Sequence, residues 1–161
     1  MTVYLQQVML PVENVLLPGF DTLPAIAVMR LANGFTHFVL LWRMDGPLVQ
    51  IMDPARGRLW LQRSEVIRDL YRHRLTLPAD DWRDWASTES FCDPLRLRMQ
   101  ALGIEASVAE HLIEEAVSGD GWRPLAALEA SIRLVAGLIE RKSVRRGEDA
   151  ARLVAELAAH D

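Results

Sequence analysis

The stretch Leu23–Asp53 decides the fold, and it reads LPAIAVMRLANGFTHFVLLWRMDGPLVQIMD. Three short apolar runs in it are separated by Asn33-Gly34 and Asp45-Gly46, which are dipeptides typical of tight hairpin turns. The stretch therefore predicts an antiparallel β-meander. Because its apolar runs are nearly continuous rather than alternating, we expect other parts of the chain to cover both faces of the sheet.

Two polar residues, His37 and Asp53, interrupt these apolar runs. Pairing outward from the second turn brings them to the same end of a hairpin. A two-residue loop would pair Phe38 with Asp53 and separate the two polar groups, whereas a three-residue loop that includes Met44 or Pro47 would place them on one face. Pro47 disfavours the tight loop because it has no N–H to donate to the ladder.

The proximity of His37 and Asp53 would suit nucleophilic catalysis. Cross-strand neighbours have Cβ atoms roughly 5 Å apart, so the Asp53 carboxylate would accept a hydrogen bond from Nδ1–H of His37. That bond would fix the tautomer and aim the other ring nitrogen at a cysteine or serine nucleophile. The alternative is structural, because Asp53-Pro54 can open an ordinary turn that ends at Gly57.

The segments LPAIA (23–27), THFVL (36–40) and MDPA (52–55) are followed by Gly57, Trp60-Leu61 and Ser64-Glu65. Together they resemble cysteine peptidase family 39. Its members are papain-like domains at the cytoplasmic N-terminus of bacteriocin-exporting ABC transporters, and they cut leader peptides after a double glycine. The resemblance covers residues 20–72 and implies that His37 corresponds to the catalytic histidine and Asp53 to the acid that orients it.

One part of the family pattern is not found. In the family, the nucleophilic Cys and the oxyanion-hole Gln lie upstream of the LPAIA segment, but residues 1–24 contain no Cys. Gln6 and Gln7 lie in an expected strand, Val3–Val8, so we assign neither to the oxyanion hole. We therefore expect this chain to be the C-terminal half of such a domain. It would be a truncated gene product, one half of a split protein or a natural pseudoenzyme, and it would be inactive alone.

The composition excludes several functional classes. The chain has 161 residues, a formal charge of −4 and one cysteine, which gives no electrostatic case for nucleic acid and no internal disulfide. The sequence has neither an apolar stretch long enough for a membrane span nor a signal peptide. We therefore expect a cytoplasmic protein, which could act at the cytoplasmic face of the membrane as part of a transporter. We expect neither a cofactor nor a bound metal.

From Asp80 onward the apolar spacing becomes helical. The expected fold class is α+β, with an antiparallel meander followed by an all-α extension. Residues 1–78 would be the papain-like half-domain, including a fourth strand over Arg58–Gln62 and a short helix capped by Ser64, and residues 79–161 the helical extension. Helix starts are expected at Asp93-Pro94, Ser107, Pro124 and about Glu148.

Two single residues of the helical half have alternative interpretations. Cys92 is the only thiol of the chain, and it is either a nucleophile that reaches His37 or a partly buried structural cysteine. His111 is followed by Glu114 and Glu115, and it belongs either to a metal site that lacks a third ligand or to an ion-paired helix face.

Two clusters also have alternative interpretations. Arg141-Lys142 with Arg145-Arg146 either complements a helix dipole or contacts acidic lipid or a transporter loop. The aromatic residues either pack the helices onto the meander or line a groove for the amphipathic helix of a leader peptide. They are Trp82, Trp85, Phe91 and Trp122.

Two functions follow from the resemblance. The first is a bacteriocin-type leader peptidase whose Cys-bearing half comes from another chain or was lost from this gene model. His37 would be its general base and later its acid, and Asp53 the group that orients His37. The second is a module that binds the leader of a secreted peptide, or docks on an ABC transporter, without cutting. The sequence does not determine an oligomeric state.

Overall fold

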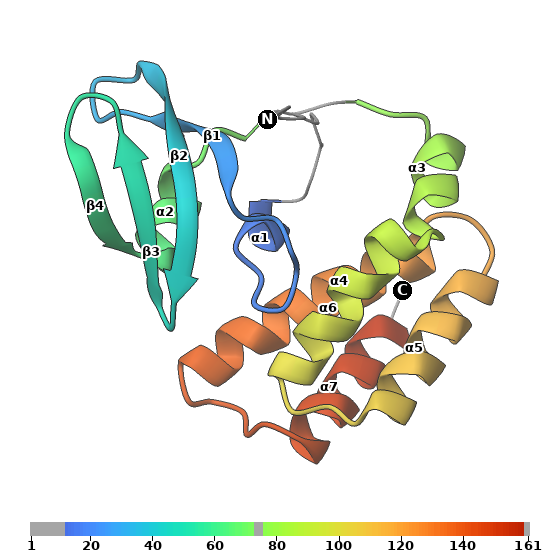
Figure 1. Ribbon diagram of the computed structural model, residues 1–161. Helices are drawn as coiled ribbons and strands as arrows, with labels where there is room; N and C mark the ends of the chain where they lie inside the picture. The colour runs from blue at the N-terminus through green and yellow to red at the C-terminus, as the bar shows by residue number, and fades with distance from the viewer. Residues whose placement is uncertain (1–11, 73–75, 160–161) are drawn as a thin grey trace. The chain divides into compact units, whose positions relative to one another are not determined.

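A computed structural model describes residues 12–72 and 76–159, and the chain divides into two compact units, Met1–Arg74 and Leu75–Asp161 (Figure 1). Each unit has its own hydrophobic core. The first contains a four-stranded antiparallel sheet, and six helices follow the sheet along the chain. The predicted α+β fold class is therefore confirmed.

The sheet is a meander in which strands that follow one another in sequence are neighbours. Its strands are β1 (Ala25–Arg30), β2 (Thr36–Asp45), β3 (Leu48–Asp53) and β4 (Gly57–Gln62). The three predicted runs and the predicted fourth strand all form. The predicted strand Val3–Val8 lies outside the described residues, as do Gln6 and Gln7.

The hairpin of β2 and β3 has a register that neither predicted loop gives by itself. Its turn is the two-residue segment Gly46-Pro47, and a β-bulge between Leu41 and Arg43 shifts the ladder by one residue. Beyond the bulge, the register equals that of a three-residue loop, so His37 and Asp53 lie on the same face. Pro47 does not prevent the tight turn because it lies in the turn itself, where no ladder bond needs its N–H.

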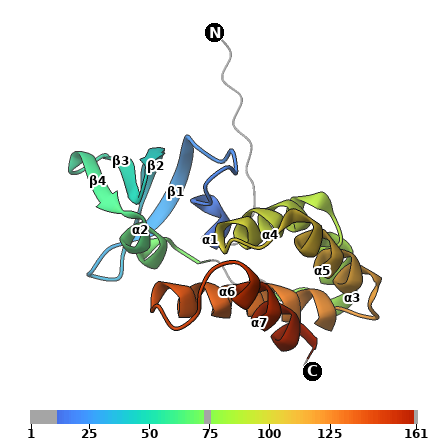
Figure 2. The ribbon, with the colours of Figure 1, turned by 90° about the horizontal axis from the view of Figure 1, so that it is seen from below.

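Two helices pack on one face of the sheet. Helices α1 (Val12–Val15) and α2 (Arg63–Asp69) contribute to the same core as the strands, and Figure 2 shows α2 below the sheet. Gln62 is the N-cap of α2, and its backbone N–H donates to the Glu65 carboxylate. Ser64, the predicted cap, lies inside the helix. The buried core residues are Leu16, Met29, Val39, Leu41, Val49, Ile51, Val66 and Leu70.

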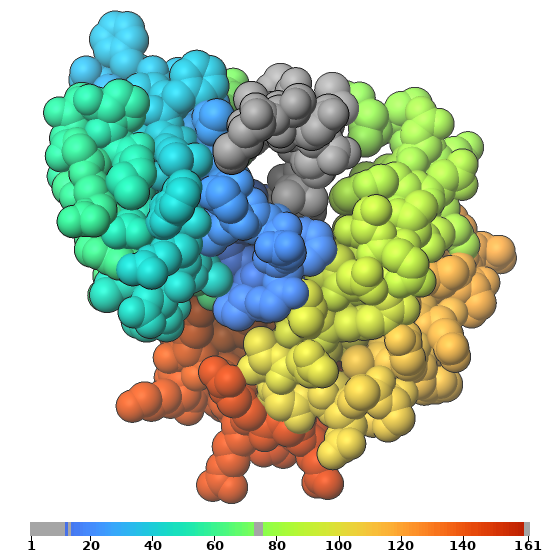
Figure 3. Space-filling model, viewed as in Figure 1, coloured from blue at the N-terminus to red at the C-terminus, as the bar shows by residue number. Residues whose placement is uncertain are grey.

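The other side of the sheet, which we name the open face, is not covered by any described residue of this unit. The large apolar side chains Ile26, Phe38, Trp42 and Trp60 are between 40% and 66% exposed. Figure 3 views this face in space-filling form. Within the sheet unit, the described residues therefore cover only one face of the sheet.

The second unit consists of helices. They are α3 (Ala79–Ala86), α4 (Glu89–Ala101), α5 (Ala106–Ser118), α6 (Arg123–Glu140) and α7 (Glu148–Ala159). The predicted starts of α6 and α7 are confirmed to within a residue. The starts of α4 and α5 are wrong, because Thr88 and Glu105 are the N-caps and Pro94 lies inside α4.

Aromatic contacts lie within the second unit. The rings of Trp82 and Trp85 contact Phe91 edge to face, with centroids 5.7 and 5.0 Å apart. Burial of Phe91 explains why α4 begins before Asp93, since the core contact outweighs the local capping signal. Trp122 is exposed. None of the described helices is both long enough and apolar enough to cross a bilayer.

Candidate functional site

The candidate site lies where β2 begins and β3 ends. His37 is the second residue of β2, and Asp53 is the last residue of β3. Nε2 of His37 and Oδ2 of Asp53 are 3.2 Å apart, which is hydrogen-bond distance. The structure thus brings together the two residues that the sequence analysis selected, and their catalytic role stays a prediction.

Asp53 uses its two carboxylate oxygens for different partners. Oδ1 accepts hydrogen bonds from the backbone N–H groups of Ala55 and Arg56, at 2.8 and 3.2 Å. Oδ2 faces His37. The turn interpretation and the catalytic interpretation of Asp53 are therefore compatible, because one oxygen fixes the turn and the other fixes the imidazole.

The environment of Asp53 favours its ionised form. The residue is only 7% exposed, and burial by itself raises the pKa of its carboxyl group. Hydrogen bonds from the Ala55 N–H, the His37 ring and the Arg56 N–H outweigh this effect and hold the pKa of Asp53 below its usual value. A carboxylate that stays ionised can hold the imidazole in one orientation.

The imidazole of His37 has the opposite ring orientation to the one predicted. Its Nε2, not its Nδ1, faces Asp53, and since an ionised carboxylate only accepts hydrogen bonds, Nε2 carries the proton. The Nδ1 atom is buried and has no hydrogen-bond partner among the described residues. Its lone pair can therefore accept a proton from a nucleophile. The ring orientation depends on a side-chain torsion, which strand spacing does not determine.

A shallow hollow of about 430 Å³ lies on the open face, and its lining includes Asp53 but not His37. Its lining is mostly apolar, and Arg58 stands among the lining side chains. A hollow of this kind can take an apolar side chain of a bound peptide. Sequence periodicity did not reveal it. The lining also includes Ile26, Phe38, Leu40, Met52 and Pro54.

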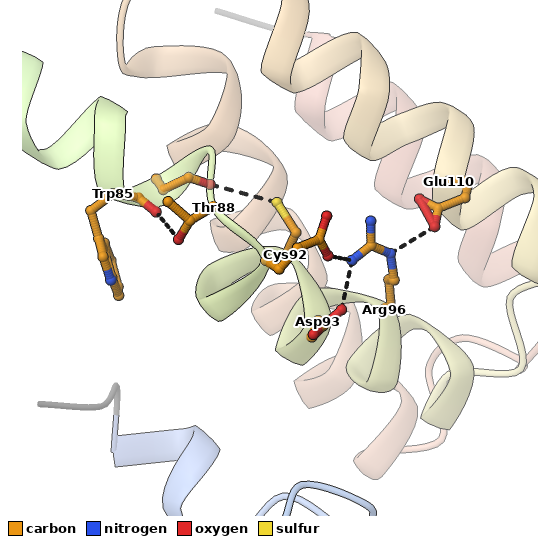
Figure 4. Close-up of polar contacts among 8 residues, drawn as sticks. Trp85, Thr88, Cys92, Asp93, Arg96 and Glu110 are labelled. Atoms are coloured by element: carbon orange, nitrogen blue, oxygen red, sulfur yellow. Dashed lines mark hydrogen bonds and ion pairs between the residues drawn. The ribbon is translucent and has the colours of Figure 1, made fainter. Parts of the chain in front are cut away.

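Cys92 has the features of a structural cysteine. It lies in α4 with 3% of its surface exposed, and its Sγ donates to the carbonyl oxygen of Ala86 at 3.6 Å. Burial raises the pKa of the Cys92 thiol, against the opposing effect of Arg96. Figure 4 shows that Arg96 instead pairs with carboxylates, among them Asp93 and Glu110. A reactive thiol needs a lowered pKa and access to solvent, and Cys92 has neither.

The remaining candidates are surface residues. His111 is exposed on α5, and the described residues contain no group of three side chains that could hold a metal ion. Arg141, Lys142 and Arg145 are exposed after α6, whereas Arg146 donates to the carbonyl oxygen of Ala101 at 2.7 Å. The basic cluster therefore includes one residue with a structural role.

Comparison with known proteins gives a family match for the first unit. Residues 6–77 match the sequence model of the Peptidase C39 family. No curated protein and no solved structure matches the chain. The matched region ends before α3, so the comparison concerns the sheet unit and its immediate continuation. The predicted resemblance to cysteine peptidase family 39 is confirmed.

Proposed function

Because residues 6–77 match the Peptidase C39 family, which supports a peptidase-like domain, we propose that the protein acts on the leader peptide of a secreted peptide. The substrate would be a leader that ends in a double glycine. The protein would work in the cytoplasm, at the cytoplasmic face of the membrane beside an ABC exporter. The observation that carries the proposal is the His37–Asp53 contact, which leaves Nδ1 of His37 without a partner among residues 12–72 and 76–159.

The proposed reaction needs a thiol beside Nδ1. This atom takes the proton of a cysteine, and the thiolate attacks the carbonyl carbon of the second glycine. The protonated Nδ1 then gives its proton to the departing amine, and water hydrolyses the thioester and restores the thiol. Asp53 keeps the imidazole oriented and stabilises its positive charge during the reaction.

A partner polypeptide would supply the thiol. The only cysteine of the chain, Cys92, is buried in the helical unit. We therefore propose that a Cys-bearing partner completes the site, with its sulfur next to Nδ1 of His37. The chain alone would not cleave a leader peptide.

A reconstitution experiment tests this proposal. The chain is mixed with a polypeptide that carries the Cys- and Gln-bearing half of a C39 peptidase, together with a synthetic double-glycine leader peptide. Mass spectrometry should find cleavage after the second glycine. His37→Ala should lower the rate by about 10²-fold or more, because it removes the general base. Asp53→Asn should lower the rate less, since the imidazole remains.

The matched control is His111→Ala, which removes an exposed histidine from α5. It should leave the rate unchanged. Circular dichroism should confirm that all three variants fold. Equal rates for the His37→Ala variant and the natural chain, or no cleavage in any mixture, would refute the assignment of His37 as general base.

A second candidate function is binding without cleavage. Burial of the Cys92 thiol favours it, because a buried thiol does not attack a peptide. The apolar hollow next to Asp53 also favours it, because it could hold an apolar side chain of a bound peptide. Fluorescence anisotropy of a labelled leader peptide, titrated with the chain alone, should then report saturable binding while mass spectrometry finds the peptide intact. If the chain alone cleaves the peptide, or if no binding occurs, this candidate fails.

A further inference from the structure

Two turns at one end of the sheet form a surface whose side chains take no part in the proposed reaction. Residues 31–35 join β1 to β2, and residues 54–56 join β3 to β4. Because the sheet is an antiparallel meander, both turns lie at the same end of it (Figure 1). The turn between β2 and β3 lies at the opposite end. We name the surface of residues 30–35 and 54–58 the turn end.

Exposed apolar side chains stand at the tip of the first turn. Phe35 is 72% exposed, more than any other large apolar residue that the structure describes, and Leu31 is 38% exposed. The backbone N–H of Leu31 donates to the carbonyl oxygen of Phe35 at 2.7 Å, and that of Gly34 donates to Leu31 at 2.9 Å. The N–H of Phe35 donates to Oδ1 of Asn33 at 3.1 Å. These N–H groups therefore stay paired if the tip leaves water, which matters in an apolar medium.

Arginine side chains surround this tip. Arg30 ends β1, Arg56 lies in the second turn, and Arg58 is the second residue of β4. All three residues are exposed. A guanidinium group binds phosphate oxygens with two parallel hydrogen bonds, so a cluster of exposed arginines suits an anionic phosphate surface.

Few carboxylates oppose these arginines. Residues 22–44 contain neither Asp nor Glu. Asp53, which precedes the second turn, is only 7% exposed. Asp69, at the end of α2, pairs with Arg68 at 2.8 Å. The chain as a whole has a formal charge of −4, so the positive charge of the turn end is a local feature.

From this combination we propose that the turn end binds the surface of a bilayer that contains anionic lipid. The side chains of Phe35 and Leu31 would enter the interface between headgroups and acyl chains, and the three arginines would pair with lipid phosphates. Stable attachment to a membrane usually takes two signals, such as an apolar anchor and a basic patch. The turn end has both.

A protein partner fits this end less well. A stable protein interface buries roughly 800 Å² of each partner, whereas the apolar part of the turn end is the narrow tip of one hairpin. The inference goes beyond the proposed peptidase function and does not depend on it, since attachment to a vesicle needs neither a thiol nor a leader peptide.

Sedimentation of the full chain with lipid vesicles tests the proposal. One set of vesicles contains about one quarter phosphatidylglycerol in phosphatidylcholine, and the other contains phosphatidylcholine alone. The chain should bind the anionic vesicles at least about tenfold more tightly than the neutral ones. Salt should reduce this preference, because it screens exposed charges.

Variants of the turn end separate the two signals. Phe35→Ser should weaken binding to the anionic vesicles at least about tenfold, because it removes the apolar anchor. The double variant Arg30→Gln with Arg56→Gln should weaken it by a similar factor and remove most of the preference for anionic lipid. The matched control is Arg141→Gln with Arg145→Gln, which makes the same change in net charge in the helical unit. It should leave binding unchanged, and circular dichroism should confirm that all variants fold.

A fluorescent label reports whether the tip enters the bilayer. In a Cys92→Ala chain, Ala32→Cys carries the environment-sensitive dye NBD in the first turn. Its emission should rise and shift to the blue with anionic vesicles. The same label at Asp45→Cys, in the turn at the opposite end of the sheet, should not respond.

Several outcomes would overturn the proposal. They are no binding to anionic vesicles, an equal loss of binding in the Arg141 and Arg145 control, and an equal response of the two labels. Binding that depends on the arginines but is unchanged in Phe35→Ser would also overturn it, since the tip would then not act as an anchor.

Discussion

At the scale of single residues, Asp53 is the centre of the site. Its side chain closes the turn after β3 through one oxygen and holds His37 through the other. The sequence predicted this pair because the two polar residues interrupt apolar strands at the same end of a hairpin. It predicted the wrong imidazole nitrogen, because Nε2 and not Nδ1 faces the carboxylate. That detail decides where a nucleophile would have to lie.

The first prediction concerns the pH dependence of stability at Asp53. A lowered pKa means that the folded state favours the ionised carboxylate, so this stabilisation is present above the unfolded-state pKa and is lost as the pH falls through the lower folded-state pKa. Asp53→Asn should therefore lower the free energy of unfolding by about 1–3 kcal/mol at neutral pH and by little in acid. Urea unfolding at several pH values, followed by fluorescence, measures the difference.

The control for this prediction is Asp45→Asn. Asp45 is exposed at the hairpin tip, so its replacement should change stability by less than about 0.5 kcal/mol at every pH. A destabilisation by Asp53→Asn that does not vary with pH would show that the carboxylate charge is not what stabilises the turn.

The second prediction concerns the reactivity of Cys92. Burial and the raised pKa of its thiol should make it react with a disulfide reagent such as DTNB much more slowly than free cysteine. Low concentrations of urea should accelerate the reaction as the helical unit opens. Cys92→Ala, which abolishes the signal, is the control for the assay. Rapid, stoichiometric modification of the folded chain would contradict the structural role assigned to this residue.

At the scale of elements, the strands form where the local sequence predicts them, whereas helices α4 and α5 begin at other residues than predicted. Each strand is a short apolar run between turn residues, so local pattern and final structure agree. Helix α4 begins at Glu89 although Asp93-Pro94 is a strong local start signal. The buried side chains of Phe91 and Cys92 explain the difference, because a helical turn around them fills the core. Tertiary packing thus outweighs the local capping signal at Asp93-Pro94.

The third prediction concerns the loop after α4. Gly103 has a φ of 79°, and a Cβ atom there would lie 2.9 Å from the backbone nitrogen of Gly147. Gly103→Ala should therefore destabilise the helical unit through both backbone strain and this contact, by about 2 kcal/mol or more. Gly121→Ala is the matched control, since Gly121 has a φ of 70° but open space around it.

In the control, Gly121→Ala, backbone strain alone should lower the free energy of unfolding, by about 1 kcal/mol. Thermal unfolding followed by circular dichroism gives both values. If the two variants lose equal stability, the close approach of Gly103 and Gly147 contributes nothing measurable.

At the scale of the whole molecule, the two units have separate cores. The core around Ile51 lies in the sheet unit, and the core around Ile132 lies in the helical unit. The two groups of buried residues share no member. Damage to one core should therefore leave the other unit folded.

The fourth prediction follows from these separate cores. Ile132 is fully buried in α6, and Ile132→Ala should destabilise the helical unit by about 2–5 kcal/mol. NMR signals of His37 should stay unchanged at a denaturant concentration that unfolds the helices of this variant. Ile51→Ala, in the sheet core, should produce the reverse pattern. Simultaneous loss of both sets of signals in either variant would mean that the units unfold as one.

The sequence by itself determined the strands, their meander order and the choice of His37 and Asp53, because these depend on alternation and turn chemistry between near neighbours. Only the tertiary structure decided the bulge between Leu41 and Arg43, the orientation of the imidazole and the open face. These features depend on how side chains from separate segments fit together. A one-residue shift at the bulge moves every following side chain to the other face, and no local pattern specifies such a shift.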